Sequence, residues 1–216
     1  MPSALAAPRV GAVLSRLYAA ATHDSRHSSP PARARAAASP AERSEAFQEV
    51  SFPVSAEVGN LLYALVRTSR PETVVEFGTS FGVSTIYLAA AVADNGAGHV
   101  VTTELSSKKV QAARSNLQQA GLARIVSILA GDARETLPGV AGPVGLVLLD
   151  GWKDLFLPVI RLLEPKLALG ALVIANDGEL ASAAAYLSYV REPANGYVTV
   201  AFPNGDGIEV SSWAGH

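Results

Sequence analysis

Several polar residues of this sequence stand at the places where long apolar runs end. They are Glu104, Asp132, Asp150 and the neighbouring pair Asn176 and Asp177. Carboxylates and amides can accept hydrogen bonds from sugar hydroxyls, hold a divalent cation or take part in proton transfer. The pattern therefore predicts a single polar site that is assembled from the ends of several strands.

A segment with two glycines lies upstream of these residues. Residues 74–84 read VVEFGTSFGVS, which is typical of a buried strand that leads into a turn and then a helix. Gly78 and Gly82 allow a tight turn and a close approach of ligand to backbone, and the helix expected from about Ser84 offers unpaired amides. This arrangement indicates a nucleotide-cofactor cradle, although two glycines alone also fit a simple strand-to-helix crossing.

Apolar strands and amphipathic helices alternate through the middle of the sequence. We expect strands at residues 73–77, 99–103, 125–129, 144–149 and 171–175, and helices at residues 56–68, 84–93, 106–120, 155–163 and 180–190. The strands are almost continuously apolar, and this predicts a parallel sheet that is covered by helices on both faces.

The last part of the sequence follows a different pattern. Residues 197–201 and 208–212 are two further expected strands, and the link at 203–207 is too short for a helical crossover, so they should form an antiparallel hairpin. The predicted fold class is therefore α/β, a Rossmann-like, seven-stranded, doubly wound sheet with a C-terminal antiparallel hairpin. Ligands of such sheets bind beyond the carboxyl ends of the strands, where the polar residues gather.

The place of each acid along this fold suggests a role. Glu104 ends the second strand, where a carboxylate accepts hydrogen bonds from both hydroxyls of a ribose. Asp132 follows the third strand and should lie beside the base of the same nucleoside. Glu76 lies inside the first strand, and the sequence leaves open whether it contacts the ligand or is a buried structural acid.

Composition excludes several classes of function. The 216 residues include no cysteine, which rules out disulfides and thiolate metal sites and is compatible with a cytoplasmic location. A net charge of −2 gives no reason to expect nucleic acid or an anionic membrane as partner. No apolar run is long enough to span a bilayer.

The sequence divides near residue 45. We expect residues 1–45 to hold an N-terminal helix at 10–21 and a Ser/Pro/Ala/Arg-rich linker at 23–40, followed by one catalytic domain at 46–216. The first helix either covers that domain or pairs with a second subunit, which makes a homodimer reasonable. The alternative is that this segment closes over the substrate.

Two motifs carry a resemblance to a known family. The segment EFGTSFGVS at 76–84 and the segment LDGWKD at 149–154 resemble those of S-adenosylmethionine-dependent O-methyltransferases of the small catechol and caffeoyl-CoA type. The resemblance extends over residues 54–213. It implies a class I methyltransferase that transfers a methyl group from S-adenosylmethionine to a hydroxyl of a small aromatic acceptor molecule.

The resemblance also implies which residues form the site. Gly78, Thr79 and Ser84 should contact the methionine part of the cofactor, Glu104 the ribose, and Asp132 and Ala133 the adenine. Glu76 and Asp150 complete the expected cofactor-binding set. Lys153 stands at the position of the lysine that helps to take the acceptor proton, and Asp150 at that of a ligand for magnesium or another divalent cation.

Two departures from the family pattern leave alternatives open. After the fifth strand the usual order is Asp-Asn, whereas here Asn176 precedes Asp177, so the expected metal ligands Asp150, Asn176 and Asp177 compete with a metal-independent mechanism. Residues 202–206 lack the glutamate that contacts the second hydroxyl of a catechol, so catechol specificity does not carry over. A non-catalytic cofactor-binding subunit is the non-enzymatic alternative.

Overall fold

One mixed sheet organises the structure. The computed structural model describes residues 3–27, 39–176, 181–203 and 207–215, with the side chains of residues 22–27 outside that description. The strand order is β3-β2-β1-β4-β5-β7-β6. The strands are β1 (Thr73–Phe77), β2 (His99–Glu104), β3 (Val126–Ala130), β4 (Val144–Leu149), β5 (Leu167–Asn176), β6 (Tyr197–Phe202) and β7 (Ile208–Trp213). The predicted seven-stranded α/β fold with its terminal hairpin is confirmed.

The sheet has a parallel part and an antiparallel part. Strands β1 to β5 pair in parallel, and β7 then pairs antiparallel with both β5 and β6. The chain order reverses between β1 and β4, because the second and third strands lie to one side of β1 and the fourth lies to the other. Ligand sites of doubly wound sheets lie at this reversal.

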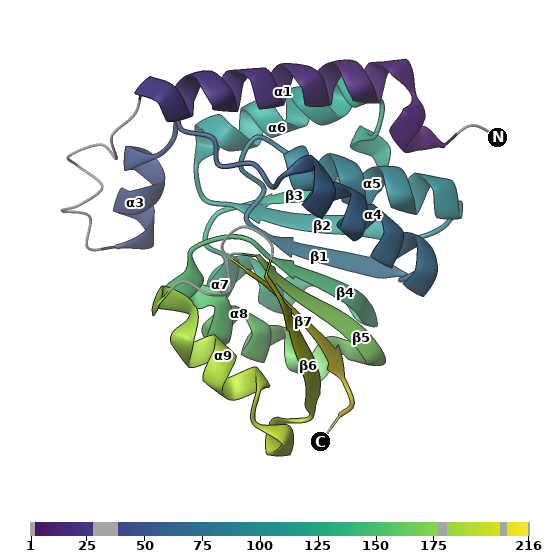
Figure 1. The fold of residues 1–216 in the computed structure, drawn as a ribbon, viewed down its shortest axis with the longest axis vertical. Coiled ribbons are helices and arrows are strands. Elements are labelled where there is room, and N and C mark those ends of the chain that lie inside the picture. The colour runs from purple at the N-terminus through teal and green to yellow at the C-terminus, as the bar shows by residue number, and fades with distance from the viewer. Residues whose placement is uncertain (1–2, 28–38, 177–180, 204–206, 216) are drawn as a thin grey trace.

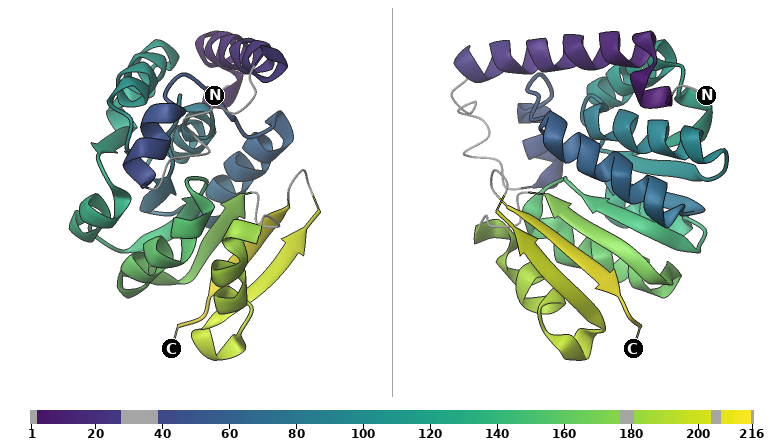
Figure 2. Two further views of the ribbon diagram at one scale, coloured as in Figure 1. Left: turned by 90° about the vertical axis from the view of Figure 1, so that its left-hand side faces the viewer. Right: turned by 45° about the vertical axis from the view of Figure 1, so that its right-hand side comes forward.

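Helices cover both faces of the sheet (Figure 1). One face carries α4, α5 and α6 with α1 outside them, and the opposite face carries α7, α8 and α9 (Figure 2). Their bounds are α1 (Pro8–His27), α3 (Pro40–Ala46), α4 (Ala56–Ser69), α5 (Val83–Asn95), α6 (Ser107–Ala120), α7 (Ala133–Thr136), α8 (Phe156–Leu163) and α9 (Ala184–Val190). Each face has its own apolar core, so the sheet is the central layer of three.

Helix α5 is enclosed from several directions. Eleven of its thirteen residues are buried, including the polar Ser84 and Thr85. A helix that is apolar around most of its circumference needs cover on more than its sheet side. Helices α4 and α1 supply that cover, and Val10, Leu14 and Leu17 of α1 belong to the same core.

This packing decides between two readings of the first helix. Its apolar side lies against α5 and α6 of the same chain, so it covers the domain that contains the sheet. The apolar character of α1 is thus used within the chain and no longer argues for a second subunit; the homodimer itself stays a prediction. Among the helices that the structure describes, none has the length and the apolar character that a membrane span requires.

Some expected boundaries were wrong. Residues 23–27 continue α1 instead of forming the start of a linker, because helical backbone hydrogen bonding persists to His27. Strand β5 begins at Leu167, four residues earlier than expected, because Leu167 already pairs with Val144 of β4. The helix expected at 180–190 is a short 3-10 turn at Ala181–Ala183 followed by α9, and residue 180 lies outside the described residues.

Helix α3 was missed altogether. Ser39 caps it by accepting from the Glu42 amide at 3.2 Å, while the Glu42 carboxylate accepts from the Ser39 amide at 2.9 Å. This reciprocal capping box, with Pro40 at the first helical position, starts a helix within a sequence of low hydrophobicity. The division expected near residue 45 therefore falls inside α3.

Candidate active site

Each glycine of the turn between β1 and α5 is required for its own reason. Gly78 has a φ of +105°, and a Cβ atom there would lie 2.8 Å from the amide nitrogen of Gly151. Only glycine therefore allows this turn to pass the loop after β4. Gly82 has a φ of +90°, but a Cβ atom there would have no contact closer than 3.7 Å, so its backbone conformation alone requires glycine.

The first half of this turn is bonded into the sheet. The amides of Gly78 and Thr79 donate to the Thr103 carbonyl at 3.2 and 3.0 Å. The Thr79 hydroxyl also donates to that carbonyl and lies 2.6 Å from the hydroxyl of Thr102. These donors are used internally, so a ligand would meet the turn through its other atoms.

The start of α5 offers the amides that the turn lacks. Its N-cap is Gly82, which has no side chain to cap the helix, and Val83 and Ser84 line the adjoining cavity. Uncapped amides at a helix N-terminus favour a carboxylate or another anion. This end of α5 suits a carboxylate, and the contact between Ser84 and the methionine part of the cofactor stays a prediction.

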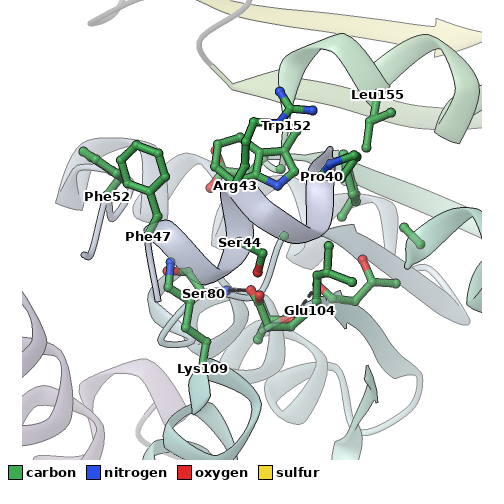
Figure 3. Close-up of a pocket in the computed structure, with 18 of the residues that line it drawn as sticks. Pro40, Arg43, Ser44, Phe47, Phe52, Ser80, Glu104, Lys109, Trp152 and Leu155 are labelled. Carbon is green, nitrogen blue, oxygen red and sulfur yellow. Dashed lines mark hydrogen bonds between the residues drawn. The ribbon is translucent and has the colours of Figure 1, made fainter. Parts of the chain in front are cut away.

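Glu104 is held in place by backbone amides. Its Oε2 accepts from the amide of Ser80 at 2.8 Å, and its Oε1 accepts from the amide of Ser106 at 2.8 Å (Figure 3). A carboxylate oxygen has room for more than one hydrogen bond, so both oxygens can still accept from a ligand. The carboxylate lines the cavity in an orientation fixed before any ligand binds.

Asp132 and Ala133 line the cavity from the loop after β3. Asp132 caps α7 by accepting from the amide of Arg134 at 2.8 Å. The Arg134 guanidinium also forms a salt bridge with it at 2.6 Å and lowers the pKa of the Asp132 carboxyl. Asp132 is therefore charged and already partnered, and Ala133 presents a small apolar wall next to it.

Glu76 lies behind the turn and is not among the residues that line the cavity. Its carboxyl is fully buried, and Oε2 accepts from the hydroxyls of Thr85 and Thr102 at 2.5 and 2.6 Å. Burial raises the pKa of Glu76 to about 7, against the hydrogen bonds that lower it. Direct contact between Glu76 and the cofactor stays a prediction.

Asp150, Lys153 and Asn176 come together where β4 and β5 end. Lys153 Nζ lies 3.6 Å from Asp150 Oδ1, and Asn176 Nδ2 donates to the same oxygen at 3.0 Å. The side chains of Asp150 and Lys153 are 11% and 14% exposed. The predicted partner Asp177 lies outside the described residues.

Two of the three predicted metal ligands are thus adjacent. Asp150 offers carboxylate oxygens and Asn176 an amide oxygen, which are the ligand types that magnesium accepts. The described residues contain no group of three or more His, Cys, Asp or Glu side chains that is arranged to hold a metal ion. Asn176 turns its amide nitrogen toward Asp150, so a divalent cation held by Asp150, Asn176 and Asp177 stays a prediction.

The opposite wall of the cavity comes from residues 40–54, which we call the cover. Pro40, Arg43, Ser44 and Phe47 of this segment face the strand ends across a cavity of about 620 Å³ (Figure 3). None of these side chains was predicted from the sequence to line the site. The capping box of α3 could have indicated a helix in this segment, but it carries no information about where that helix docks.

One bidentate ion pair joins the cover to the loop after β4. Arg43 donates to the two carboxylate oxygens of Asp154 at 2.9 and 2.8 Å, and this lowers the pKa of Asp154. The Arg43 guanidinium also lies 4.9 Å from the ring centre of Trp152, and Phe47 packs against the same ring with centroids 5.8 Å apart. The cavity is therefore bounded by aromatic rings on its cover side.

Lys109, which lines the cavity from α6, was also not predicted from the sequence. The expected site residues Gly78, Thr79, Ser84 and Glu104 all line the same cavity. The structure also brings Asp132, Ala133, Asp150 and Lys153 to it, whereas Glu76 stands behind it.

Comparisons with known proteins agree with this geometry. Residues 75–178 match the family described as "Methyltransferase domain". A catechol O-methyltransferase of Mycobacterium tuberculosis is 40% identical over 112 residues, which are 51% of this chain and 50% of that protein. The chain thus matches about half the length of this relative.

Solved structures resemble the fold over most of its length. The cofactor-bound protein Rv0187 from MTB is 29% identical, with a TM-score of 0.71 over 88% of this chain and 100% of its own. An O-methyltransferase from Bacillus cereus in complex with SAH is 22% identical, with a TM-score of 0.67 over 93% of this chain and 99% of its own, and this likeness concerns the fold alone.

Proposed function

We propose that the chain is a class I S-adenosylmethionine-dependent O-methyltransferase of the small catechol and caffeoyl-CoA type, and that it methylates a hydroxyl group of a small aromatic acceptor. The observation that carries the proposal is the cavity between the cover and the opposite wall. We call that wall the cradle; it consists of the turn at residues 78–84, Glu104 and residues 131–133. Ser84, Glu104 and Lys153 line the cavity together with the aromatic ring of Trp152. Both a nucleoside cofactor and a flat acceptor find suitable groups there.

The cradle fits the cofactor in three places. The uncapped start of α5 suits the methionine carboxylate, and the carboxylate of Glu104 suits the two ribose hydroxyls. The small side chain of Ala133 leaves room for the adenine ring. When bound, S-adenosylmethionine supplies a methyl group on a positively charged sulfur, already activated for transfer to oxygen.

The chain's own contribution to the reaction is alignment and removal of a proton. The cradle and the cover hold the two reactants in line, which supplies much of the rate enhancement in such displacements. Lys153 lies at the strand ends beside Asp150. Lys153 Nζ is the group placed to take the proton from an acceptor hydroxyl as that oxygen would become the nucleophile.

We further propose that a divalent cation assists the methyl transfer. Asp150, Asn176 and Asp177 would hold it, and it would lower the pKa of an acceptor hydroxyl bound to it. The alternative is metal-independent transfer, in which the Lys153 amine and Asp150 act without a cation. The salt bridge between Lys153 and Asp150 supports that alternative, because a lysine already neutralises the carboxylate.

The acceptor class follows from the cover. Phe47 and Phe52 pack edge to face, with ring centroids 5.8 Å apart, and Phe47 contacts Trp152. Aromatic walls of this kind favour a flat aromatic ring between them. The relatives named catechol O-methyltransferase agree with a phenolic acceptor, although their names decide neither the ring nor the number of its hydroxyls.

Calorimetric titration with S-adenosylmethionine, in magnesium and in chelator, tests the proposal. We expect binding in both conditions, followed by methylation of at least one member of a panel of catechols, hydroxycinnamates and single-hydroxyl phenols. Turnover only in magnesium would establish the cation, and equal turnover in chelator would establish the metal-independent alternative. Binding without turnover on any acceptor would favour a non-catalytic cofactor-binding subunit, and absence of binding would refute the proposal.

Glu104→Ala tests the cradle directly. Loss of the acceptor for both ribose hydroxyls should weaken cofactor binding by about 100-fold, because hydrogen bonds to a charged group are each worth about 1.5–3 kcal/mol. Glu135→Ala is the control, since that acid is exposed and lies on α7 away from the cavity lining. An unchanged dissociation constant in Glu104→Ala would remove the ribose assignment.

A further inference from the structure

Two adjacent lysines at the start of α6 are placed in contrasting surroundings. Lys108 is exposed and forms an ion pair with Glu49. Lys109 is buried and lines the cavity, on the side where Ser80 and Glu104 lie (Figure 3). Neighbouring residues of one helix thus send one ammonium group to the surface and the other into the site.

The position of Lys109 is unfavourable for the stability of the fold. Burial lowers the pKa of the Lys109 amine, and the charge of Glu104 only partly opposes that effect. Within the described residues, no carboxylate lies within ion-pair distance of Lys109 Nζ. The ammonium group lies over the Phe81 ring, 5.5 Å from its centre. A buried charge without an ionic partner is costly.

The helix itself adds to this cost. Ser106 is the N-cap of α6, and Lys109 follows it by three residues, within the first helical turn, where there is no acidic residue. The N-terminus of a helix carries partial positive charge, so an ammonium group there is repelled. Folding alone therefore gives no reason for a lysine at this position, and a ligand group is the natural partner.

The neighbouring carboxylate indicates which group that is. Glu104 is close enough to influence the charge state of Lys109, yet the two side chains form no direct ion pair. The Glu104 oxygens are held in place by the amides of Ser80 and Ser106 and have room to accept further bonds from a ligand in the cavity that Lys109 also lines. A hydroxyl group fits this space, because it donates to a carboxylate and accepts from an ammonium group at the same time.

We propose that Lys109 is a cofactor-positioning residue that donates a hydrogen bond to a ribose hydroxyl oxygen of the bound cofactor, opposite Glu104. The inference rests on the proposed function, because it requires a ribose at Glu104. The acid and the amine then hold the diol from two sides and fix the rotation of the ribose ring. This orientation sets the line along which the methyl group meets the acceptor.

The test uses S-adenosylhomocysteine and its 2′,3′-dideoxy analogue with the wild type, Lys109→Met and Lys108→Met. We expect Lys109→Met to weaken binding of S-adenosylhomocysteine about tenfold, the loss of one charged hydrogen bond. Binding of the dideoxy analogue should change by less than about twofold, because the partner atoms are absent. Lys108→Met should leave both dissociation constants unchanged.

Thermal unfolding of the ligand-free proteins completes the test. Lys109→Met should unfold at the same temperature as the wild type or a higher one, because an unpaired buried charge has been removed. A lower unfolding temperature with unchanged affinity would make Lys109 structural and overturn the inference. Equal losses for both ligands would also overturn it, whereas failure of the wild type to bind S-adenosylhomocysteine would overturn the proposed function as well.

Discussion

The cradle and the cover form two walls of one cavity, but they are held by different kinds of contact. In the cradle, the carboxylate of Glu104 and the turn at Gly78 are fixed by backbone hydrogen bonds to neighbouring strands and loops. The cover docks through side chains, chiefly the Arg43 contact with Asp154 and the packing of Phe47 on Trp152.

This difference separates two tasks. Backbone hydrogen bonds give the cradle one geometry whatever acceptor is used, which suits a constant cofactor. Side chains can change while the fold persists, so the cover suits the selection of a particular acceptor. We therefore expect changes in the cradle to alter cofactor affinity and stability, and changes in the cover to alter acceptor use.

The largest expected effect is at Lys153, where the two walls meet. Lys153→Met should lower turnover by about 10²- to 10⁴-fold, because the proton acceptor is lost, while the dissociation constant of the cofactor stays within about twofold. Steady-state kinetics and calorimetry on the same preparation measure both. Lys153→Arg keeps the positive charge beside Asp150, so recovery of turnover in that variant would show that charge, and not proton transfer, is the contribution of Lys153.

Breaking the cradle at Gly78 comes next. Gly78→Ala should lower the free energy of unfolding by about 3 kcal/mol, because strain at positive φ adds to a clash with the Gly151 backbone. Gly96→Ala is the matched control, since Gly96 also has a positive φ but open space around its Cα, and it should lose only about 1 kcal/mol. Chemical denaturation measures both, and equal losses would show that the close approach at Gly78 is unimportant.

The buried acid behind the cradle gives a pH dependence. The pKa of Glu76 is raised from 4.5 to about 7 by burial, so the folded state holds its proton more tightly than the unfolded state. The resulting stabilisation is complete below pH 4.5 and is lost as the pH rises to about 7, a fall of about 3 kcal/mol.

Glu76→Gln removes this titration. Its unfolding free energy should therefore fall less than that of the wild type between about pH 5 and 8, as denaturation at several pH values would measure. Glu72→Gln, at an exposed position just before β1, is the control and should follow the wild type. Parallel curves for Glu76→Gln and the wild type would contradict the raised pKa.

The smallest effect is expected in the cover. Removing Arg43 or Asp154 should cost less than about 1 kcal/mol of stability, because the pair is partly exposed. Acceptor KM should rise a few-fold while the cofactor dissociation constant is unchanged. Arg134→Ala on the cradle side should show the reverse, and a double-mutant cycle of Arg43 and Asp154 measures their coupling. Loss of cofactor affinity on removing Arg43 would contradict the assignment of cofactor binding to the cradle and acceptor binding to the cover.

Most of the fold was predictable because it depends on local patterns. Continuous apolar runs gave β1 and β4 their expected bounds, and the short link after β6 indicated the hairpin. The insertion of β7 between β5 and β6 was not predicted, since strand order depends on pairing between distant segments. The length of α1 was underestimated because its last turns are polar, and helical bonding continued without an apolar signal.

The two walls of the site were unequally predictable for the same reason. The places of Gly78 and Glu104 in the cavity lining could be predicted because both follow from their positions at strand ends in a strand-turn-helix pattern. Arg43 and Phe47 were missed because the residues that they contact in the site lie more than a hundred residues later in the sequence. Lys109 was missed because a lysine in the first turn of an amphipathic helix usually faces solvent.

The position of β7 also affects how the protein is made. During synthesis β6 leaves the ribosome before β7, the strand that joins it to the rest of the sheet. Until residues 208–213 emerge, β5 exposes an unpaired edge, and β6, with the apolar side chains Val198 and Val200, has no strand to pair with. Open edges of this kind attract other chains. The nascent chain is therefore most exposed to aggregation before β7 appears, when a chaperone would protect it best.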